Sequence, residues 1–145
     1  RMTSLYAASV EWDHTGILIC GKSGSGKSDL ALRLIDAGAE LVADDRPIVE
    51  NRDGRLIATC PDLIKGLIEV RGIGIVEQPF IPETTVLLKI NLRPAAEIER
   101  LPAPETELIE NVPVSVYNLD AFESSAVAKV KMMARIVGNK RKTVS

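Results

Sequence analysis

The architecture of this chain follows from one octapeptide, Gly21-Lys22-Ser23-Gly24-Ser25-Gly26-Lys27-Ser28. It matches the phosphate-binding loop pattern G-x-x-x-x-G-K-[ST]. The apolar residues 17–20 run into this loop as a predicted strand, and residues 28–36 leave it as a predicted helix. A strand before the loop and a helix after it form the context that the pattern requires. The alternative is a Gly/Ser-rich turn that caps a helix, but such a turn does not explain why a lysine and a hydroxyl follow the last glycine.

Each residue type in this loop has a chemical reason to be there. Glycines allow successive backbone N–H groups to converge on phosphate oxygens, next to the positive end of a helix. We expect Lys27 to reach the β- and γ-phosphates, and the Ser28 hydroxyl to ligate a metal ion. The loop therefore predicts binding of a nucleoside phosphate.

The composition limits the class of protein. The chain has 145 residues, enough for one domain with a substantial core, which we place at residues 1–145. Hydrophobic residues make up 46% but aromatic residues only 3%, so the core must be built from Ile, Leu and Val. The formal net charge of -2 excludes a global basic field for nucleic acid, and no apolar run approaches a membrane span of about 18 residues. Cys20 and Cys60 fit neither a CxxC nor a zinc pattern, and together these features suit the cytoplasm.

Hydrophobic patterning predicts an α/β chain in which hairpins interrupt the alternation of strands and helices. The predicted strands are residues 4–12, 17–20, 40–43, 47–50, 55–59, 67–71, 84–92 and 112–117. The first helix ends before Gly38, and a second is predicted at 121–137, opened by Asp120 and Glu123 as a capping box and ended by Gly138. Residues 94–110 are the least regular stretch. A mixed sheet with helices packed on it fits this order better than an all-parallel doubly wound sheet.

Two adjacent carboxylates, Asp44 and Asp45, follow the predicted strand 40–43. In phosphate-loop proteins the carboxyl edge of the sheet adjoins the loop, so one aspartate can hold a metal and the other can accept a proton from an attacking hydroxyl. Two carboxylates beside a triphosphate need a cation, which argues for magnesium. The alternative is an acidic turn exposed to water.

Glu69 and Arg71 are two residues apart in a predicted strand and therefore point to the same face. Glu69 can ligate a metal and Arg71 can stabilise phosphoryl charge, while the alternative for both is a surface ion pair. Gly72 and Gly74 then give a flexible turn. His14, the one histidine, is expected to be a solvated turn residue at the end of its strand away from the phosphate loop.

Together these motifs resemble the HPr kinase/phosphorylase family, in its short form without an N-terminal domain. Members of this family place phosphate on a serine of the small phosphocarrier protein HPr, and many also remove it by phosphorolysis. The resemblance is close from about residue 4 to residue 76. It rests on the phosphate loop, on Leu-Val-Ala-Asp-Asp-Arg at 41–46 and on Ile-Glu-Val-Arg-Gly-Ile-Gly-Ile at 68–75.

The resemblance implies a role for each matching residue. Asp45 would accept the proton in phosphorylation and donate one in the reverse direction, while Lys27 would stabilise the transferring phosphate. Ser28 and Glu69 would ligate magnesium. The implied fold is the phosphoenolpyruvate-carboxykinase-like type of P-loop domain.

The resemblance also extends to assembly and docking. The family's catalytic signature corresponds to residues 68–77, with Arg71 inside it. In the family these domains form hexamers, and a C-terminal helix, here residues 121–137, helps to dock HPr. The end of this chain is basic through Lys129, Lys131, Arg135, Lys140, Arg141 and Lys142. Two readings stay open: cations favoured at a helix C-terminus, or a docking face for an acidic partner.

Two features depart from the family pattern. Tyr6 occupies the position of a catalytic histidine; it could hydrogen-bond Asp45, but a side chain with a reference pKa of about 10 cannot shuttle protons near neutral pH. His14 lies on the wrong side of the hairpin to replace it. The connection between residues 76 and 84 is short and lacks the arginine that many members use in dephosphorylation. We therefore expect phosphorylase activity to be weak or absent.

The resulting prediction is an ATP- and magnesium-dependent protein-serine kinase that acts on an HPr-like phosphocarrier. The alternative is a nucleotide-binding regulatory module with little catalysis, motivated by Tyr6. A small-molecule kinase would need a lid domain and a substrate pocket, for which 145 residues with one short loop offer little room.

Overall fold

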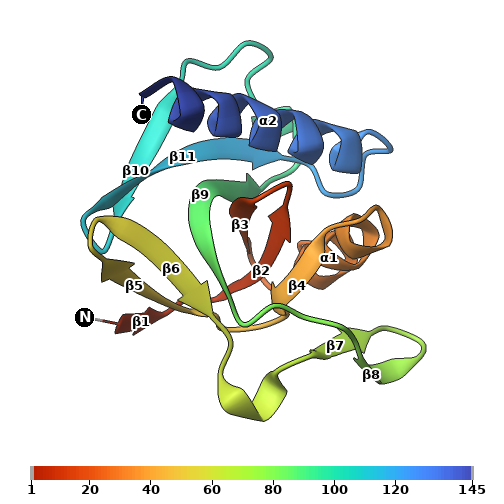
Figure 1. The fold of residues 1–145 in the computed structure, drawn as a ribbon. Helices are drawn as coiled ribbons and strands as arrows, with labels where there is room; N and C mark the ends of the chain where they lie inside the picture. The colour runs from red at the N-terminus through yellow and green to blue at the C-terminus, as the bar shows by residue number, and fades with distance from the viewer. Residues whose placement is uncertain (1, 145) are drawn as a thin grey trace.

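The computed structural model describes residues 2–144, with side-chain burial described as far as Asn139. These residues form a mixed nine-stranded sheet, a separate two-stranded hairpin and two α-helices (Figure 1). The strands are β1 (Met2–Ser4), β2 (Ala7–Trp12), β3 (Thr15–Cys20), β4 (Glu40–Ala43), β5 (Ile48–Arg52), β6 (Arg55–Thr59), β7 (Leu67–Val70), β8 (Gly74–Glu77), β9 (Glu83–Leu92), β10 (Glu105–Ile109) and β11 (Val112–Leu119). The α-helices are α1 (Lys27–Asp36) and α2 (Ala126–Val144), and two short 3-10 helices lie at Asp62–Ile64 and Ala95–Glu97. Within the described chain no helix is long and apolar enough to span a membrane. The predicted α/β class and mixed sheet are confirmed.

The sheet is organised around β9, which changes partner along its length. The strand order is β1-β5-β6-β9-β3-β2-β4, and β11 with its neighbour β10 also adds to β9. Residues 83–85 of β9 pair antiparallel with β6, whereas residues 86–91 pair parallel with β3. One strand therefore joins the hairpin half of the sheet to the half that precedes the phosphate loop.

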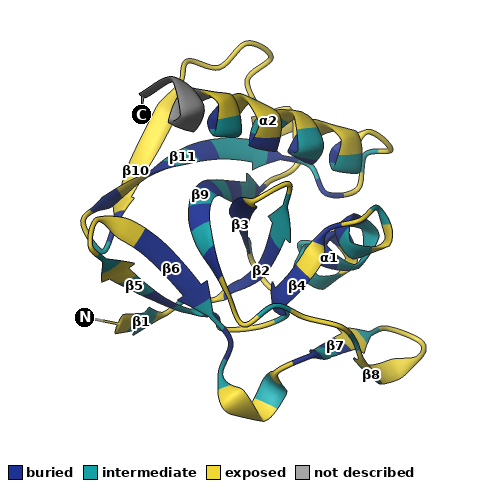
Figure 2. Cartoon of the chain, in the orientation of Figure 1, coloured by how far each residue is buried: buried dark blue, intermediate teal, exposed yellow. Residues whose placement is uncertain are grey.

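The strand β3 is buried on both faces, and its alternate residues face two different cores. Ile17 and Ile19 belong to a core formed with both helices, whereas Leu18 belongs to a core closed by β5, β6 and the β10–β11 pair. All three side chains are fully buried, and Figure 2 shows how the inner strands contrast with the largely exposed β7–β8 hairpin. The core is aliphatic, as the composition predicted.

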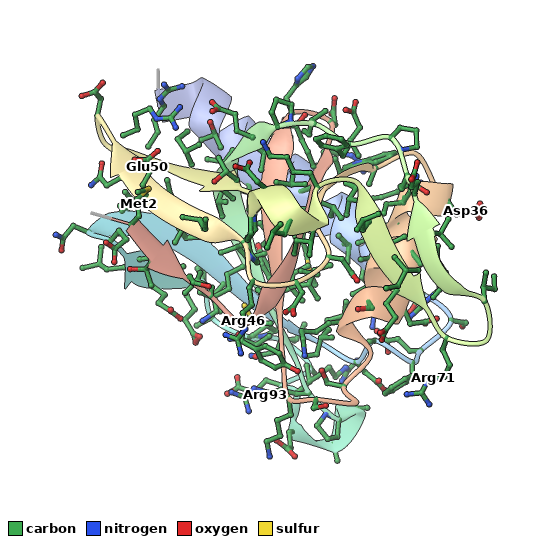
Figure 3. The ribbon with its side chains drawn as sticks, turned by 90° about the horizontal axis from the view of Figure 1, so that it is seen from below. Met2, Asp36, Arg46, Glu50, Arg71 and Arg93 are labelled. Carbon is green, nitrogen blue, oxygen red and sulfur yellow. The ribbon has the colours of Figure 1, made fainter. Side chains whose placement is uncertain are left out.

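Four strands, β3, β4, β9 and β11, run in the same direction, because β2 is antiparallel to both β3 and β4. Their carboxyl ends meet at one edge of the sheet. Arg46 follows β4 and Arg93 follows β9, and both lie on the same side of the molecule (Figure 3). This is the edge at which ligands bind in α/β sheets.

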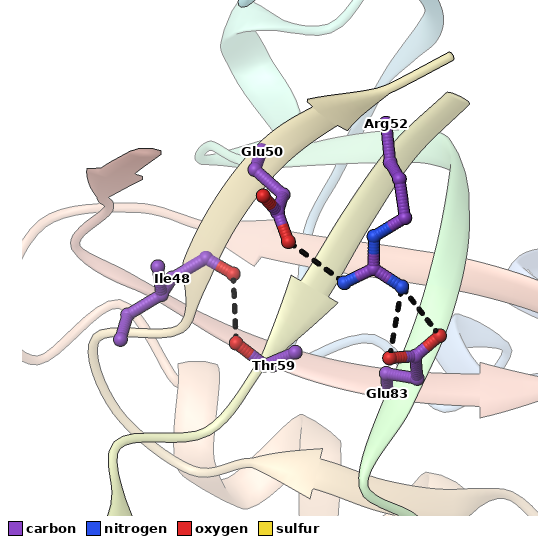
Figure 4. Close-up of polar contacts among 5 residues, drawn as sticks. All are labelled: Ile48, Glu50, Arg52, Thr59 and Glu83. Atoms are coloured by element: carbon purple, nitrogen blue, oxygen red, sulfur yellow. Dashed lines mark hydrogen bonds and ion pairs between the residues drawn. The ribbon is translucent and has the colours of Figure 1, made fainter. Parts of the chain in front are cut away.

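The predicted β5–β6 hairpin is fastened to the start of β9. Asp53 and Gly54 form its two-residue turn with φ of 55° and 84°, as expected of an Asp-Gly pair. Arg52 donates to the two Glu83 oxygens at 3.1 and 3.0 Å and to Glu50 at 2.7 Å (Figure 4). This bridge orients the hairpin across β9, although exposed ion pairs add little stability.

Two stretches differ from the predicted strands. Residues 4–12 form parts of two strands rather than one. Up to Ser4 the chain pairs with β5, the Leu5 N–H then bonds to the Pro47 carbonyl at 3.1 Å, and from Ala7 the chain pairs with β3. Residues 94–110, predicted to be irregular, contain β10. The first four residues of β10 are exposed, so this strand on the edge of β11 has no apolar alternation to reveal it.

The second helix begins and ends later than predicted. Asp120 does not cap it: the Asp120 Oδ1 accepts the Phe122 N–H at 3.0 Å and closes a turn before the helix. Glu123 is not part of a capping box but bonds to Lys129 within α2. Gly138 lies inside α2, because its φ is not in the left-handed region and the helix continues to Val144. The predicted bounds of 121–137 are therefore wrong at both ends.

Candidate active site

The carboxyl edge of the sheet gathers most of the predicted site residues. The phosphate loop follows β3, and Asp44 and Asp45 follow β4. Tyr6 precedes β2, which runs in the opposite direction, so it lies at the same edge. His14 is exposed in the turn at the far end of β2 and β3, with a φ of 63°, which confirms it as a solvated turn residue.

The phosphate loop is closed by its own contacts. Lys27 Nζ donates to the carbonyl oxygens of Gly21 at 2.8 Å and Lys22 at 3.1 Å, and the Ser25 N–H donates to the Lys22 carbonyl at 3.0 Å. A Cβ on Gly21 would lie 2.5 Å from Ser25 Oγ and 3.1 Å from Leu92 Cβ, so any larger residue there has to displace the Ser25 side chain. The ammonium is therefore held inside the loop by two carbonyl bonds that phosphate oxygens can replace.

The start of α1 supplies N–H donors to the same loop. Gly26 caps the helix with a φ of 96°, and the first helical hydrogen bond joins the Leu30 N–H to the Gly26 carbonyl at 2.9 Å. The N–H groups of residues 27–29 precede that bond and have no partner within the helix. Together with the positive helix end they make an anion-binding site.

Tyr6 carries two cations on its ring. The Lys27 ammonium lies 4.0 Å from the ring centroid, and the Arg46 guanidinium carbon lies 5.4 Å from it. Each such contact at a partly exposed site is worth about 0.5–1 kcal/mol. Sequence reasoning predicted that Tyr6 lies near the loop but assigned no role to Arg46, although Arg46 is the last residue of the motif at 41–46.

Asp44 is the half-buried member of the acidic pair. Its Oδ2 accepts the Glu69 N–H at 3.0 Å, while its Oδ1 is buried with no hydrogen-bond partner among the described residues. Burial raises the pKa of Asp44, and the Glu69 N–H and the nearby Ser28 hydroxyl lower it in part. Asp45 is exposed. The structure therefore separates the two carboxylates, one beside Ser28 and one open to an incoming group.

The surroundings of Asp44 fit a magnesium ion. A buried carboxylate oxygen without a donor, next to a serine hydroxyl, is the oxygen-only donor set that Mg²⁺ prefers. Glu69 reaches this pair through its backbone, and its side chain is exposed. Among the side chains that the structure describes, no three of His, Cys, Asp or Glu lie close enough to share a metal. The site suits an ion that takes one or two carboxylates and completes its shell with phosphate oxygens and water.

Arg71 lies in the exposed turn of the β7–β8 hairpin (Figure 3). Over the described part of the chain it forms no hydrogen bond or ion pair, so the alternative of a Glu69–Arg71 surface pair is wrong. Gly72 and Gly74 have φ of 89° and 117°, and a Cβ on either would meet nothing within 4 Å. The hairpin thus presents Arg71 to solvent on an open turn, as the two glycines predicted.

A segment that sequence reasoning missed also lies against the phosphate loop. Arg33 of α1 donates to the Ala121 carbonyl and pairs with Asp29 at 3.0 Å. The Phe122 Cζ lies 3.2 Å from the position that a Cβ on Gly26 would take. No local pattern can find this contact, because the Arg33–Ala121 bond joins residues 88 apart in the sequence.

The basic face of α2 is partly engaged within the chain. Lys129 pairs with Glu123, and the Lys131 ammonium lies 4.5 Å from the centroid of the Trp12 ring. Arg135 is exposed. The other basic side chains, Lys140, Arg141 and Lys142, lie outside the described side chains. The two readings of this end, helix-terminal cations and docking face, therefore both stand.

Comparisons with known proteins agree on one family. The family model described as the HPr Serine kinase C-terminal domain matches residues 1–134. The HPr kinase/phosphorylase of Clostridium tetani is 42% identical over 88 residues, which cover 61% of this chain and 29% of that protein. The HPr kinase/phosphorylase of Clostridium novyi is 38% identical over 123 residues, which cover 77% of this chain and 40% of that protein. This chain therefore spans less than half the length of these two relatives.

A solved structure extends the likeness to the whole fold. The structure of the Hpr(Ser) kinase/phosphatase from Coxiella burnetii matches with a TM-score of 0.86 and 27% sequence identity. The match covers 97% of this chain and 99% of that chain. The curled mixed sheet and its two helices are therefore shared with that protein.

Proposed function

This chain belongs to the HPr serine kinase C-terminal domain family, and on that premise we propose that it transfers phosphate from ATP to a serine of an HPr-like phosphocarrier protein. The observation that carries the proposal is the half-buried Asp44 beside Ser28 at a preformed phosphate loop, with Asp45 left open to an acceptor. Phosphoryl transfer depends on a phosphate cradle, a metal and a group that orients or deprotonates the nucleophile. This edge of the sheet offers residues for each.

The transfer step uses the loop and Asp45. Lys27 exchanges its two carbonyl partners for β- and γ-phosphate oxygens of ATP, and the N–H groups of residues 27–29 hold the same charge. The acceptor serine hydroxyl attacks the γ-phosphorus in line. The new O–P bond forms as the bond to the β,γ-bridging oxygen breaks, and ADP leaves. Asp45 takes the hydroxyl proton.

Asp44 and Ser28 are the residues that we propose to hold magnesium, with Glu69 as the further ligand that the family resemblance implies. When bound, the ion supplies positive charge to the β- and γ-phosphate oxygens. The unpartnered Asp44 Oδ1 supports this assignment, because a buried acceptor without a donor is costly. Arg71 on the open hairpin is proposed to stabilise phosphoryl charge once an acceptor is bound.

Tyr6 weakens the case for the reverse reaction, so we propose that phosphorylase activity is weak or absent. The second candidate function is a nucleotide-binding regulatory module with little catalysis. It is favoured by the engagement of Lys27 with two carbonyls and the Tyr6 ring. Tyr6→His separates the two candidates: a large gain in transfer supports an attenuated kinase, and no gain supports the module.

Assembly and location rest on family membership alone. We propose that residues 1–145 act as one domain, that the chain forms homo-oligomers, with the family's hexamer as the first candidate, and that it acts in the cytoplasm, where ATP and a phosphocarrier are both available. Its partners would be nucleotide and the phosphocarrier protein.

The decisive experiment is transfer of label from γ-labelled ATP with magnesium to purified HPr, compared with an HPr variant that lacks its acceptor serine. Label on the serine supports the kinase, and absence of label with ATP binding intact supports the regulatory module. Asp45→Asn should keep ATP affinity and lower transfer by roughly 100- to 10,000-fold. Asp13→Asn is the matched control, because it makes the same charge change in the exposed turn at the far end of the sheet. Unchanged transfer by Asp45→Asn would remove Asp45 from the mechanism.

A further inference from the structure

Phe122 is an exposed aromatic side chain at the phosphate loop. The chain has only two Phe, two Tyr and one Trp, and 71% of Phe122 is exposed to solvent. Its Cζ and Cε1 lie 3.2 and 3.3 Å from where a Cβ on Gly26 would be. The ring therefore packs against the last glycine of the loop by part of its surface and leaves the rest open.

The position of this ring is fixed relative to the loop by polar contacts. The Phe122 N–H donates to Asp120 Oδ1 at 3.0 Å, which closes the turn after β11. The carbonyl of Ala121 accepts a bond from Arg33, which belongs to the helix that starts at the phosphate loop. An aromatic face held in this way loses little freedom when a ligand stacks on it.

The strand order indicates which part of a bound nucleotide would reach the Phe122 ring. The proposed metal residues, Ser28 and Asp44, lie between β3 and the β4 side of the sheet, whereas β9 and β11 lie on the opposite side of β3. A nucleotide whose γ-phosphate faces Asp45 must extend its sugar and base away from β4. Phe122 follows β11 on that other side.

We propose that Phe122 is the stacking platform for the purine base of the bound nucleotide, with the phosphates on the loop after β3 and the base on the turn after β11. This inference rests on the proposed ATP-dependent function and adds the subsite that holds the nucleoside part. Every base has a π-face, so stacking on one exposed ring contributes affinity for the base without hydrogen-bond readout.

The test compares a ligand that has a base with one that lacks it. Binding of ATP and of inorganic triphosphate, each with magnesium, is measured by calorimetry for the wild-type chain and for Phe122→Ala. We expect ATP affinity to fall by about tenfold and triphosphate affinity to stay the same. Leu108→Ala is the control, because it removes another exposed apolar side chain (68% exposed) on β10 and should change neither affinity.

A second variant keeps the test independent of folding. Phe122→Trp should keep ATP affinity, and ATP but not triphosphate should change its added fluorescence relative to the wild-type signal of Trp12. Equal ATP affinity in Phe122→Ala and wild type would overturn the proposal. So would a parallel loss of ATP and triphosphate affinity, which would make the ring a structural part of the loop.

The outcomes also separate this inference from the proposed function. If ATP binding depends on Phe122 but no label reaches HPr, the subsite stands and the acceptor assignment fails. If label reaches HPr and Phe122→Ala binds ATP normally, the kinase stands and the subsite fails. If the wild-type chain binds triphosphate but gains nothing from the base, the subsite fails, and failure to bind either ligand overturns both.

Discussion

The phosphate loop and the β7–β8 hairpin both hold glycines at positive φ, but only the loop also packs glycines closely against their neighbours. A Cβ on Gly21 would lie 2.5 Å from Ser25 Oγ, and one on Gly26 would lie 3.2 Å from Ala121 and Phe122. Gly72 and Gly74 have open space around them and need glycine only for their positive φ. The loop is therefore shaped before a ligand arrives, whereas the hairpin leaves room for a group that comes to it.

The two regions also differ in how they are held. Lys27, Arg33 and Ser25 tie the loop and its surroundings together from inside. The hairpin joins the acidic pair through the Glu69 N–H bond to Asp44, and its Ile73 and Ile75 are 76% and 71% exposed. We therefore expect changes in the loop to act on nucleotide binding and changes in the hairpin to act on transfer.

Gly21→Ala should have the largest effect, on nucleotide affinity. Its Cβ has to displace Ser25 Oγ and approach Leu92 Cβ at 3.1 Å, and overpacking of this kind costs about 1–3 kcal/mol. Affinity for ATP should fall by roughly 10- to 100-fold in a calorimetric titration. Gly54→Ala is the control, since it adds the same methyl group in the exposed β5–β6 turn, where nothing lies within 4 Å of the added Cβ. Normal ATP affinity in Gly21→Ala would show that the loop is not preformed.

Gly74→Ala should leave ATP affinity unchanged and lower transfer to HPr by about tenfold. A φ of 117° is closed to an L side chain, so the hairpin has to move at a cost of about 1–2 kcal/mol, although no neighbour is displaced. Transfer and binding are measured on the same preparation. A loss of ATP binding in this variant would erase the distinction between the two regions.

Asp44→Asn should stabilise the ligand-free chain at neutral pH, because it removes a partly buried charge. The gain should be at most about 1 kcal/mol, since water screens a half-exposed carboxylate. Burial raises the pKa of Asp44 above its unfolded value, so its contribution to stability is full below about pH 3.9 and is lost as pH rises through the raised pKa. Urea unfolding at pH 7 and pH 4 should show the advantage of the variant only at pH 7.

The same variant should lose the effect of magnesium on ATP affinity, which Asp53→Asn, an exposed hairpin carboxylate, should keep. Equal stability of Asp44→Asn and wild type at both pH values would mean that burial does not strain this carboxylate.

Tyr6→Leu should have the smallest effect, a loss of about 0.5–1 kcal/mol of stability for each cation that leaves the ring. Tyr6→Phe keeps the aromatic face under Lys27 and Arg46 and should unfold like wild type in urea. If Tyr6→Phe loses as much stability as Tyr6→Leu, the hydroxyl rather than the ring is the stabilising group.

Local patterns could predict the part of the fold where neighbours in sequence are also neighbours in space. The strand before the loop, α1 and β4 were predicted nearly to the residue, because each is a short apolar run bounded by glycine or charge. The exposed β10 and the start of α2 were not predicted correctly. The strand β10 forms because it pairs with β11, and α2 starts late because Asp120 closes a turn before it.

The same limit applies to the site. Lys27, Ser28 and the acidic pair carry recognisable spacing, and the structure places Ser28 beside Asp44. The contacts of Arg46 and Phe122 depend on which strand ends meet at the sheet edge, which no spacing along the chain records.

The position of β9 in the sequence sets the order in which the site can form during synthesis. The loop, Asp45 and Arg71 all leave the ribosome before residues 83–92 do. Until then β3 lacks its parallel neighbour, and Leu18 lacks Val86 in its core. A nascent chain that has emerged only as far as residue 82 therefore carries nearly every chemical group of the site without the scaffold that aligns them, because long-range pairing comes last. Nucleotide binding is in this sense a late step of folding, and ATP present during translation would stabilise only those chains in which β9 has formed.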